Sequence, residues 1–299
     1  MNNTINSQNS QLSADETDAL LEVVNTQLDD KTFNIDDQKI LKQMVESLGD
    51  GRGMIRFSFA EALGDIGKPA TPFLIAALSQ HINVAVRRAS AKTLTLIADP
   101  KAVPTLVDSL LYDRDTVVKG SVVGALAKTG ETSVPALLQI IASNEYPESS
   151  KGLATWALAF VGLGAKEYVY KAIHSKSPEV RAAVIGSIAT ITQENPEANA
   201  VAILLEAIND PVSFVRCEAT TALSNIKYTP AVPKLIDLLA NHADWKTRKA
   251  AALALMKIGE TAAIQPLQAA LVKEKEAPVV AAIKSAIAQL DKLVITDDW

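Results

Sequence analysis

Residues suited to catalysis or metal binding are scarce in this 299-residue sequence. The three histidines, His81, His174 and His242, lie six or seven residues before a recurring basic residue, so each occupies a comparable turn of a different repeat. Because stacked helices lie about 8–10 Å apart, we expect these histidines to face solvent rather than to share one metal ion. None is followed by glutamate, so the repeated His-Glu pairs of di-iron hydroxylases are absent.

The single cysteine, Cys217, has two interpretations. It follows Arg216, and a neighbouring cation favours a reactive thiolate; alternatively, it is a small residue that fills a helix. The sequence has no glycine-rich phosphate loop, GxSxG elbow or CxxC pair. One cysteine excludes an internal disulfide and fits a reducing compartment, so we expect a cytoplasmic protein.

These residues belong to a repeat, in which an apolar and a basic residue precede a run of small residues. Its copies begin at Ile55, Val86, Val118, Ser150, Val180, Val215 and Thr247, and the next residue is Arg or Lys in each. The copies are 30 to 35 residues apart. An eighth copy begins near Val279 but has Val280 in the basic position, as expected of an atypical terminal repeat.

Each copy resolves into two helices. In residues 70–97, apolar residues follow helical spacing, residues 80–83 interrupt it, and a second apolar pattern runs to Ile97. Proline recurs in the first turn of the first helix, where it costs little: Pro72, Pro104, Pro135, Pro233 and Pro266. The tetratricopeptide and ankyrin signatures are absent, and the armadillo unit needs about 40 residues or more. The sequence therefore predicts an all-α, right-handed α-solenoid of about seven to eight HEAT-like two-helix repeats.

The basic residue of each copy also has two interpretations. It can pair with an acid in a neighbouring turn, such as Asp113, Asp210 or Asp244, which forms a ladder that fixes the angle between repeats. The alternative is a ladder of cations that binds a ligand. The turn acids can also cap the second helices.

Four segments are expected along the chain. Residues 1–12 read as a disordered tail, and 13–49 as an N-terminal helical cap that opens with a capping box at Ser13 and Glu16. The repeats occupy residues 50–292. Residues 293–299 form an exposed acidic C-terminal tail.

The most informative residues lie on the second helix of each copy. If the apolar start is position one, then positions one, five, eight, nine and twelve form the core, and positions three and seven share the opposite face. Glycine costs about 1 kcal/mol in a helix relative to alanine, yet Gly120, Gly124, Gly152 and Gly186 occupy four of these exposed positions. Their missing side chains predict a depression; the alternative is that they allow close helix approach.

This depression would have an aromatic floor and cationic walls. Trp156 and Phe160 would form the floor, and Arg88, Lys92 and Lys249 the walls, unless Trp156 belongs to the core. Such a groove suits a flat, conjugated, anionic ligand or an acidic partner helix. The candidate binding residues are Phe57, Glu61, Arg88, Lys92, Gly120, Gly124, Gly152, Trp156, Phe160, Gly186, Thr221 and Lys249.

Three segments, Val86 to Leu94, Asp99 to Leu106 and Ile226 to Leu235, resemble the phycobilisome lyase HEAT-like repeat family. The resemblance extends over about residues 50–292. It implies that the second helices line a concave surface, and that the ligand is a phycobilin such as phycocyanobilin. It also implies a cyanobacterial source, a phycobiliprotein subunit as partner, and a second lyase-like subunit, because the E/F-type lyases act as unlike pairs.

Two function classes remain. The first is a bilin-handling protein that orients a chromophore for attachment or transfer, which needs few catalytic side chains. The second is a protein-binding scaffold without chemistry, since one relative in the family is linked to iron–sulfur carrier proteins. The net charge of −5 disfavours nucleic acid, and no apolar run is long enough to cross a membrane.

Overall fold

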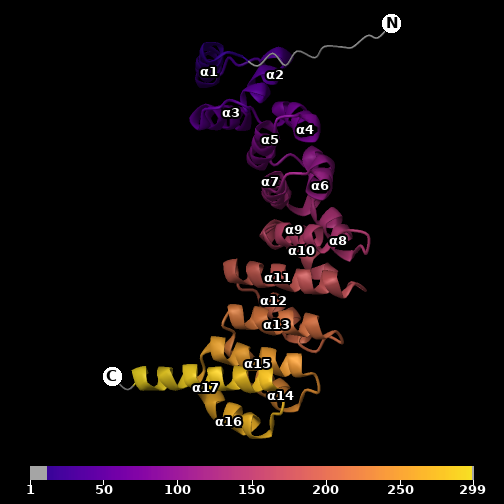
Figure 1. The fold of residues 1–299 in the computed structure, drawn as a ribbon, viewed down its shortest axis with the longest axis vertical. Helices are drawn as coiled ribbons and strands as arrows, with labels where there is room; N and C mark the ends of the chain where they lie inside the picture. Colours follow the sequence, from indigo (N-terminus) through magenta and orange to yellow (C-terminus); the bar gives the residue numbers. More distant parts are fainter. Residues whose placement is uncertain (1–11, 298–299) are drawn as a thin grey trace. The chain divides into compact units, whose positions relative to one another are not determined.

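The computed structural model describes residues 12–297, and every regular element in that range is an α-helix or a short 3₁₀ turn (Figure 1). The chain divides into two compact units. The N-terminal unit contains Met1–Ile140 and Asn144–Ala157, and the C-terminal unit contains Ile141–Ser143 and Leu158–Trp299. The all-α solenoid class is confirmed.

Helices follow one another as pairs, as the repeat predicts. The first helices are α2 (Gln38–Ser47), α4 (Thr71–Gln80), α6 (Val103–Tyr112), α8 (Val134–Ala142), α10 (Lys166–Ala172), α12 (Ala198–Ala207), α14 (Val232–Asn241) and α16 (Ile264–Lys273). The second helices are α3 (Gly53–Ile66), α5 (Val84–Ile97), α7 (Thr116–Lys128), α9 (Glu148–Ala159), α11 (Pro178–Glu194), α13 (Ser213–Asn225), α15 (Trp245–Ile258) and α17 (Ala277–Asp297). Only α1 (Ala14–Asp29) stands outside a pair among these elements.

The core lies where the repeat places it. Positions five, eight and nine are buried in all seven copies. Position eight holds a small residue and position nine a large aliphatic one, such as Ala125 and Leu126 in α7. This alternation lets adjacent second helices interdigitate, and each fully buried leucine contributes about 1.5–3 kcal/mol. Position one is also buried from the second copy onward, whereas position twelve is buried in four copies and only half-buried at Ile66, Ile97 and Ile226.

Local signals set the helix ends. Pro72, Pro104 and Pro233 lie in the first turns of their helices, as predicted. The turn carboxylates of Asp115 and Asp244 accept N–H bonds at the starts of α7 and α15, which confirms them as caps. Asp210 instead accepts the N–H of Val212 and does not cap α13. The contacts of Asp115 and Asp244 each satisfy a backbone donor that a helix start leaves unpaired.

The ends of the repeat array differ from the expected boundaries. Ser13 and Glu16 form the predicted capping box at α1. However, α2 packs against α3, α4 and α5 like the first helix of a pair, so the repeats begin before residue 50. Helix α17 continues through residue 293 to Asp297, so the expected tail boundary falls inside a helix. Most of the expected tail 1–12, and residues 298–299, lie outside the described range.

An arginine ladder links successive repeats within each unit. It consists of Arg87–Asp113 (Nε to Oδ2, 2.8 Å), Arg181–Asp210 (Nε to Oδ2, 2.7 Å), Arg216–Asp244 (Nη2 to Oδ2, 3.0 Å) and Arg248–Glu274 (Nε to Oε2, 2.7 Å). The first pair lies in the N-terminal unit and the others in the C-terminal unit. The predicted acids Asp113, Asp210 and Asp244 are confirmed as partners, and Glu274 adds a fourth.

The ladder arginines also close the turns of their own repeats. In each, Nη1 donates to two carbonyl oxygens between the paired helices; for Arg248 these belong to His242 (2.9 Å) and Ala243 (2.8 Å). The lysines at this position do not reach the next repeat. Lys119 donates to the Leu111 carbonyl, and Lys151 pairs with Glu148 on its own helix. Arginine is required because its planar guanidinium can hold a carboxylate and a carbonyl together.

Replacing Arg216 with alanine is expected to lower the free energy of unfolding by about 3 kcal/mol. Arg216 is 8% exposed and binds Asp244, Thr247 and two turn carbonyls, and removing one partner leaves a poorly solvated charge behind. Urea unfolding measures the loss. Arg114→Ala, at an exposed turn residue, is the control and should change stability by no more than about 0.5 kcal/mol. Equal losses in both variants would show that the ladder is not stabilising.

Acid should weaken the same contacts in a defined pH range. Hydrogen bonds from Arg248 lower the pKa of Glu274 to about 2, from an ordinary value of 4.5. A lowered folded-state pKa means that the stabilisation is complete above pH 4.5 and is lost as pH falls toward 2. Unfolding measured from pH 7 downward should show this loss, and Glu274→Gln should show a smaller acid dependence over that range. An unchanged acid dependence in the variant would contradict the assignment.

Candidate functional site

The face formed by positions three and seven of the second helices, the second-helix face, is accessible as predicted. None of its residues is buried in any of the seven copies. Trp156 is 52% exposed and Phe57 is 55% exposed, and Phe160, one turn beyond Trp156, is 60% exposed. Trp156 therefore lies on the surface and is not a core residue.

The glycines of this face border open space. A Cβ added at Gly120, Gly152 or Gly186 would meet no neighbouring atom within 4 Å, and one at Gly124 would lie 3.8 Å from the Thr95 hydroxyl oxygen. Close helix approach therefore does not explain these glycines. In the N-terminal unit, Gly120, Gly124 and Gly152 leave the backbone of α7 and α9 uncovered. Gly186 does the same on α11 of the C-terminal unit.

The expected cationic walls are only partly available in the N-terminal unit. Arg88 binds both oxygens of Asp115, at 2.9 and 2.6 Å, and these bonds lower the pKa of Asp115 to about 2. Arg88 is therefore committed to holding the cap of α7. Lys92 is exposed. Glu61 lines a polar groove of about 610 Å³ with Asp29 and Asp65, so this end of the face is acidic.

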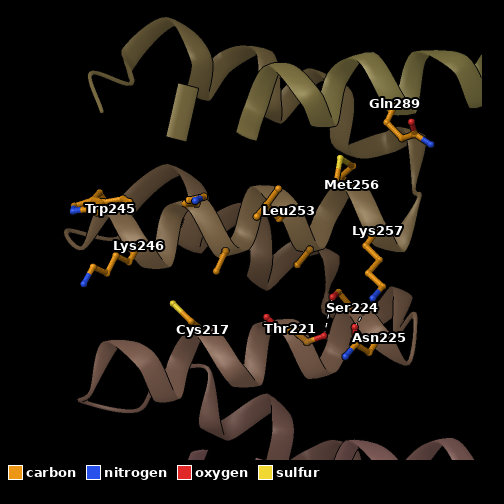
Figure 2. A pocket seen from close by; sticks show the side chains of 13 residues that line it. Cys217, Thr221, Ser224, Asn225, Trp245, Lys246, Leu253, Met256, Lys257 and Gln289 are labelled. Atoms are coloured by element: carbon orange, nitrogen blue, oxygen red, sulfur yellow. Dashed lines mark hydrogen bonds between the residues drawn. The ribbon is translucent and has the colours of Figure 1, made fainter. Parts of the chain in front are cut away.

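A groove of about 750 Å³ lies on the second-helix face of the C-terminal unit, along α15 and between α13 and α17 (Figure 2). We call it the lysine groove. It is lined by Cys217, Thr221, Ser224, Asn225, Trp245, Lys246, Lys249, Ala250, Leu253, Ala254, Met256, Lys257 and Gln289. Of the residues predicted from the sequence, it contains Thr221 and Lys249; the other ten are distributed elsewhere along the chain.

The residues that the sequence prediction missed follow a simple rule. Trp245, Lys249, Leu253 and Lys257 are spaced by four, so they form one row along α15. Positions three and seven of this repeat copy correspond only to the two middle residues of the row, Lys249 and Leu253. Extending the row by one turn in each direction would have found Trp245 and Lys257. The same extension on α13 leads from Cys217 and Thr221 to Asn225. Figure 2 shows Trp245 and Lys246 at one end of the groove and Lys257 with Asn225 at the other.

The charge of this lining has one sign. It contains three lysines and no aspartate or glutamate. Within the described residues, none of the three lysines forms an ion pair. Lys246 lies 5.9 Å from the centroid of the Trp245 ring, and Lys257 donates to the amide oxygen of Asn225. Two carboxylates of the flanking turns are already bound to the ladder, Asp244 to Arg216 and Glu274 to Arg248.

Cys217 lines the groove but is not activated. Burial raises the pKa of its thiol, and the nearby Asp244 carboxylate raises it further, against the opposing effect of Arg216. The thiol form therefore predominates at neutral pH, and the reactive-thiolate interpretation is not supported. The residue instead contributes a small, weakly polar group to the wall from α13.

Two of the histidines accept backbone hydrogen bonds in the turns between paired helices. His81 and His242 are half-buried, not solvent-facing as expected, whereas His174 is exposed. Nδ1 of His81 accepts the N–H of Asn83, and Nδ1 of His242 accepts that of Asp244, each at 3.0 Å. No group of three or more His, Cys, Asp or Glu side chains is arranged to hold a metal in the described part of the chain. Nor is any described helix long and apolar enough to cross a bilayer.

Comparison with known proteins agrees with this architecture. The chain matches the HEAT repeats family over residues 71–159, 134–224, 165–244 and 201–288. The structure of Kap121p bound to Nup53p is similar in fold, with a TM-score of 0.54 and 14% identity, over 92% of this chain and 36% of that one. The bilin biosynthesis protein MpeU of Synechococcus sp. (strain WH8020) is 35% identical over 244 residues, which are 81% of this chain and 82% of MpeU. The chain therefore belongs to the HEAT-repeat proteins and, among them, to the phycobilin lyase-like family.

The glycines that border open space generate a stability prediction. Gly120→Ala and Gly152→Ala should each raise the free energy of unfolding by about 0.5–1 kcal/mol, because alanine is the better helix former and its methyl group meets no neighbour. Gly259→Ala is the control and should lose stability, since this residue has a φ of +90°. Urea unfolding measures all three. A loss at Gly120 or Gly152 would show that the open surface is filled in solution.

Proposed function

We propose that this protein handles a bilin: it holds an open-chain tetrapyrrole on its second-helix face and orients it for attachment to, or transfer onto, a phycobiliprotein subunit. The single observation that carries the proposal is the match to MpeU across four-fifths of the chain. The accessible face of each unit adds support: the N-terminal unit has exposed aromatic side chains and uncovered backbone, and the C-terminal unit has a groove lined by lysines without ion pairs. These are features that suit a flat, conjugated, anionic molecule.

On this proposal, the protein contributes to the reaction by positioning the bilin beside the partner. The described residues offer no activated thiol and no cluster of metal ligands. Holding two reactants in a productive geometry can by itself contribute several kcal/mol to lowering a barrier. On this proposal the partner's cysteine and the bilin supply the reacting groups. The chain binds the bilin, limits its conformations and presents it. We place this activity in the cytoplasm of a cyanobacterium, with or without a second lyase-like subunit.

A second function, a protein-binding scaffold, is favoured by the large apolar side chains of the N-terminal unit. Phe57 is 55% exposed and Leu96 61% exposed, on the second helices α3 and α5. Exposed aromatic and aliphatic residues of this kind are typical of protein interfaces. A phycobiliprotein subunit and an iron–sulfur carrier protein are the two partners to compare. Binding of the subunit is compatible with bilin handling, whereas binding of the carrier alone would favour the scaffold.

A titration with phycocyanobilin tests the proposed function. Absorbance and fluorescence of the bilin should become red-shifted and sharper on addition of the protein, because a held chromophore has fewer conformations, and the change should saturate at one bilin per chain. Bilin in buffer alone is the control. In the presence of the apo-phycobiliprotein subunit, the bilin should become covalently attached to that subunit faster than without this chain. No spectral change, together with capture of a protein partner, would favour the scaffold.

A further inference from the structure

The lysine groove differs from the remainder of the second-helix face in its electrostatics. Lys246, Lys249 and Lys257 all line this groove, and no carboxylate belongs to its lining. Two acids in the turns beside α15, Asp244 and Glu274, have arginine partners from the ladder. An anion that enters the groove therefore meets three lysines without having to displace an ion pair. In contrast, Arg88 in the N-terminal unit would have to leave Asp115 before it could bind a ligand.

The spacing of the lysines specifies how an anion would be held. Lys246 and Lys249 are three residues apart, so they lie on neighbouring turns of one face, with Cβ atoms about 5–6 Å apart. Lys257 lies eight residues beyond Lys249, which is about 12 Å along the helix. The first two lysines thus suit two carboxylates carried close together on one molecule, and the third suits a more distant polar group.

The uncharged part of the lining suits a long conjugated ring system. Between the lysines, α15 contributes Leu253 and Met256 to the lining. The side chains of Ala250 and Ala254 are small, so they leave room in the groove along this helix. Trp245 adds an aromatic surface at one end. The opposite wall, from α13, carries small polar side chains such as Thr221 that can meet ring nitrogens or carbonyls. The volume of about 750 Å³ lies in the usual range for sites that bind small molecules.

We propose that the lysine groove is the bilin site of this protein, and that Lys246 and Lys249 bind the two propionate carboxylates while the tetrapyrrole lies along Leu253 and Met256. The inference rests on the proposed function, because the bilin is its ligand. It assigns binding to the C-terminal unit. Lys257 and Asn225 face the far end of the chromophore. Trp156 and the glycines of the N-terminal unit are then left to contact the protein partner.

Two matched pairs of variants test the assignment. Lys249→Glu should weaken phycocyanobilin binding at least tenfold, whereas Lys92→Glu, the same charge change on the second-helix face of the N-terminal unit, should leave it within twofold. Likewise, Trp245→Ala should weaken binding by about tenfold and Trp156→Ala should not. Melting temperatures of all four variants identify any that are misfolded. The dissociation constant is read from the spectral titration.

The dimethyl ester of phycocyanobilin tests the role of the carboxylates separately. It should bind the unmodified protein at least tenfold more weakly than the free acid, and Lys249→Glu should reduce this preference for the free acid. Equal binding of acid and ester would overturn the assignment of the lysines. If bilin binding is normal in Lys249→Glu but lost in Trp156→Ala, the site lies in the N-terminal unit, and the inference fails while the proposed function stands. If the unmodified protein binds no bilin, the proposed function itself fails.

Discussion

The bond between a ladder arginine and the acid of the following repeat is the interaction on which the structure depends. Each of these arginines closes its own inter-helix turn through carbonyl oxygens and then reaches the next repeat, so one side chain fixes two turns. A HEAT-like repeat buries too little surface to stand alone, and its stability comes from its neighbours. Arg216, which is almost fully buried, shows the cost of this arrangement, because its charge is compensated only while Asp244 and Thr247 remain in place.

The same ladder shapes the site. Asp244 and Glu274 lie in the turns beside α15, where they would otherwise neutralise the lysines of that helix. Both are bound to arginines, and neither forms an ion pair with Lys246 or Lys249 in the described part of the chain. Where the ladder position holds a lysine instead, as at residues 119 and 151, the cation stays within its own repeat. If the lysine groove binds the bilin as proposed, a change in one of these turn acids should alter both stability and ligand binding.

A protein that only positions a chromophore needs few catalytic side chains. Its thiol is protonated, two of its histidines are occupied in turns, and its accessible face is built from aromatic rings, uncovered glycines and lysines. These groups bind and orient. The bilin-handling proposal therefore agrees with the inventory of side chains as well as with the relationship to MpeU, because a chromophore that carries its own reactive group requires only a defined position beside the cysteine that accepts it.

The sequence by itself determined the repeat, the paired helices, the core positions and three of the ladder acids, because period and burial pattern are local properties that recur seven times. It also placed Thr221 and Lys249 on the accessible face. Only the tertiary structure decided which cations are paired, since pairing depends on side chains 26 to 31 residues apart: Arg88 is bound to Asp115, whereas Lys249 has no ion-pair partner among residues 12–297. It also decided that Trp156 is exposed and that the groove lies along α15. Packing of α13 and α17 against α15 creates that hollow, and no single helix encodes it.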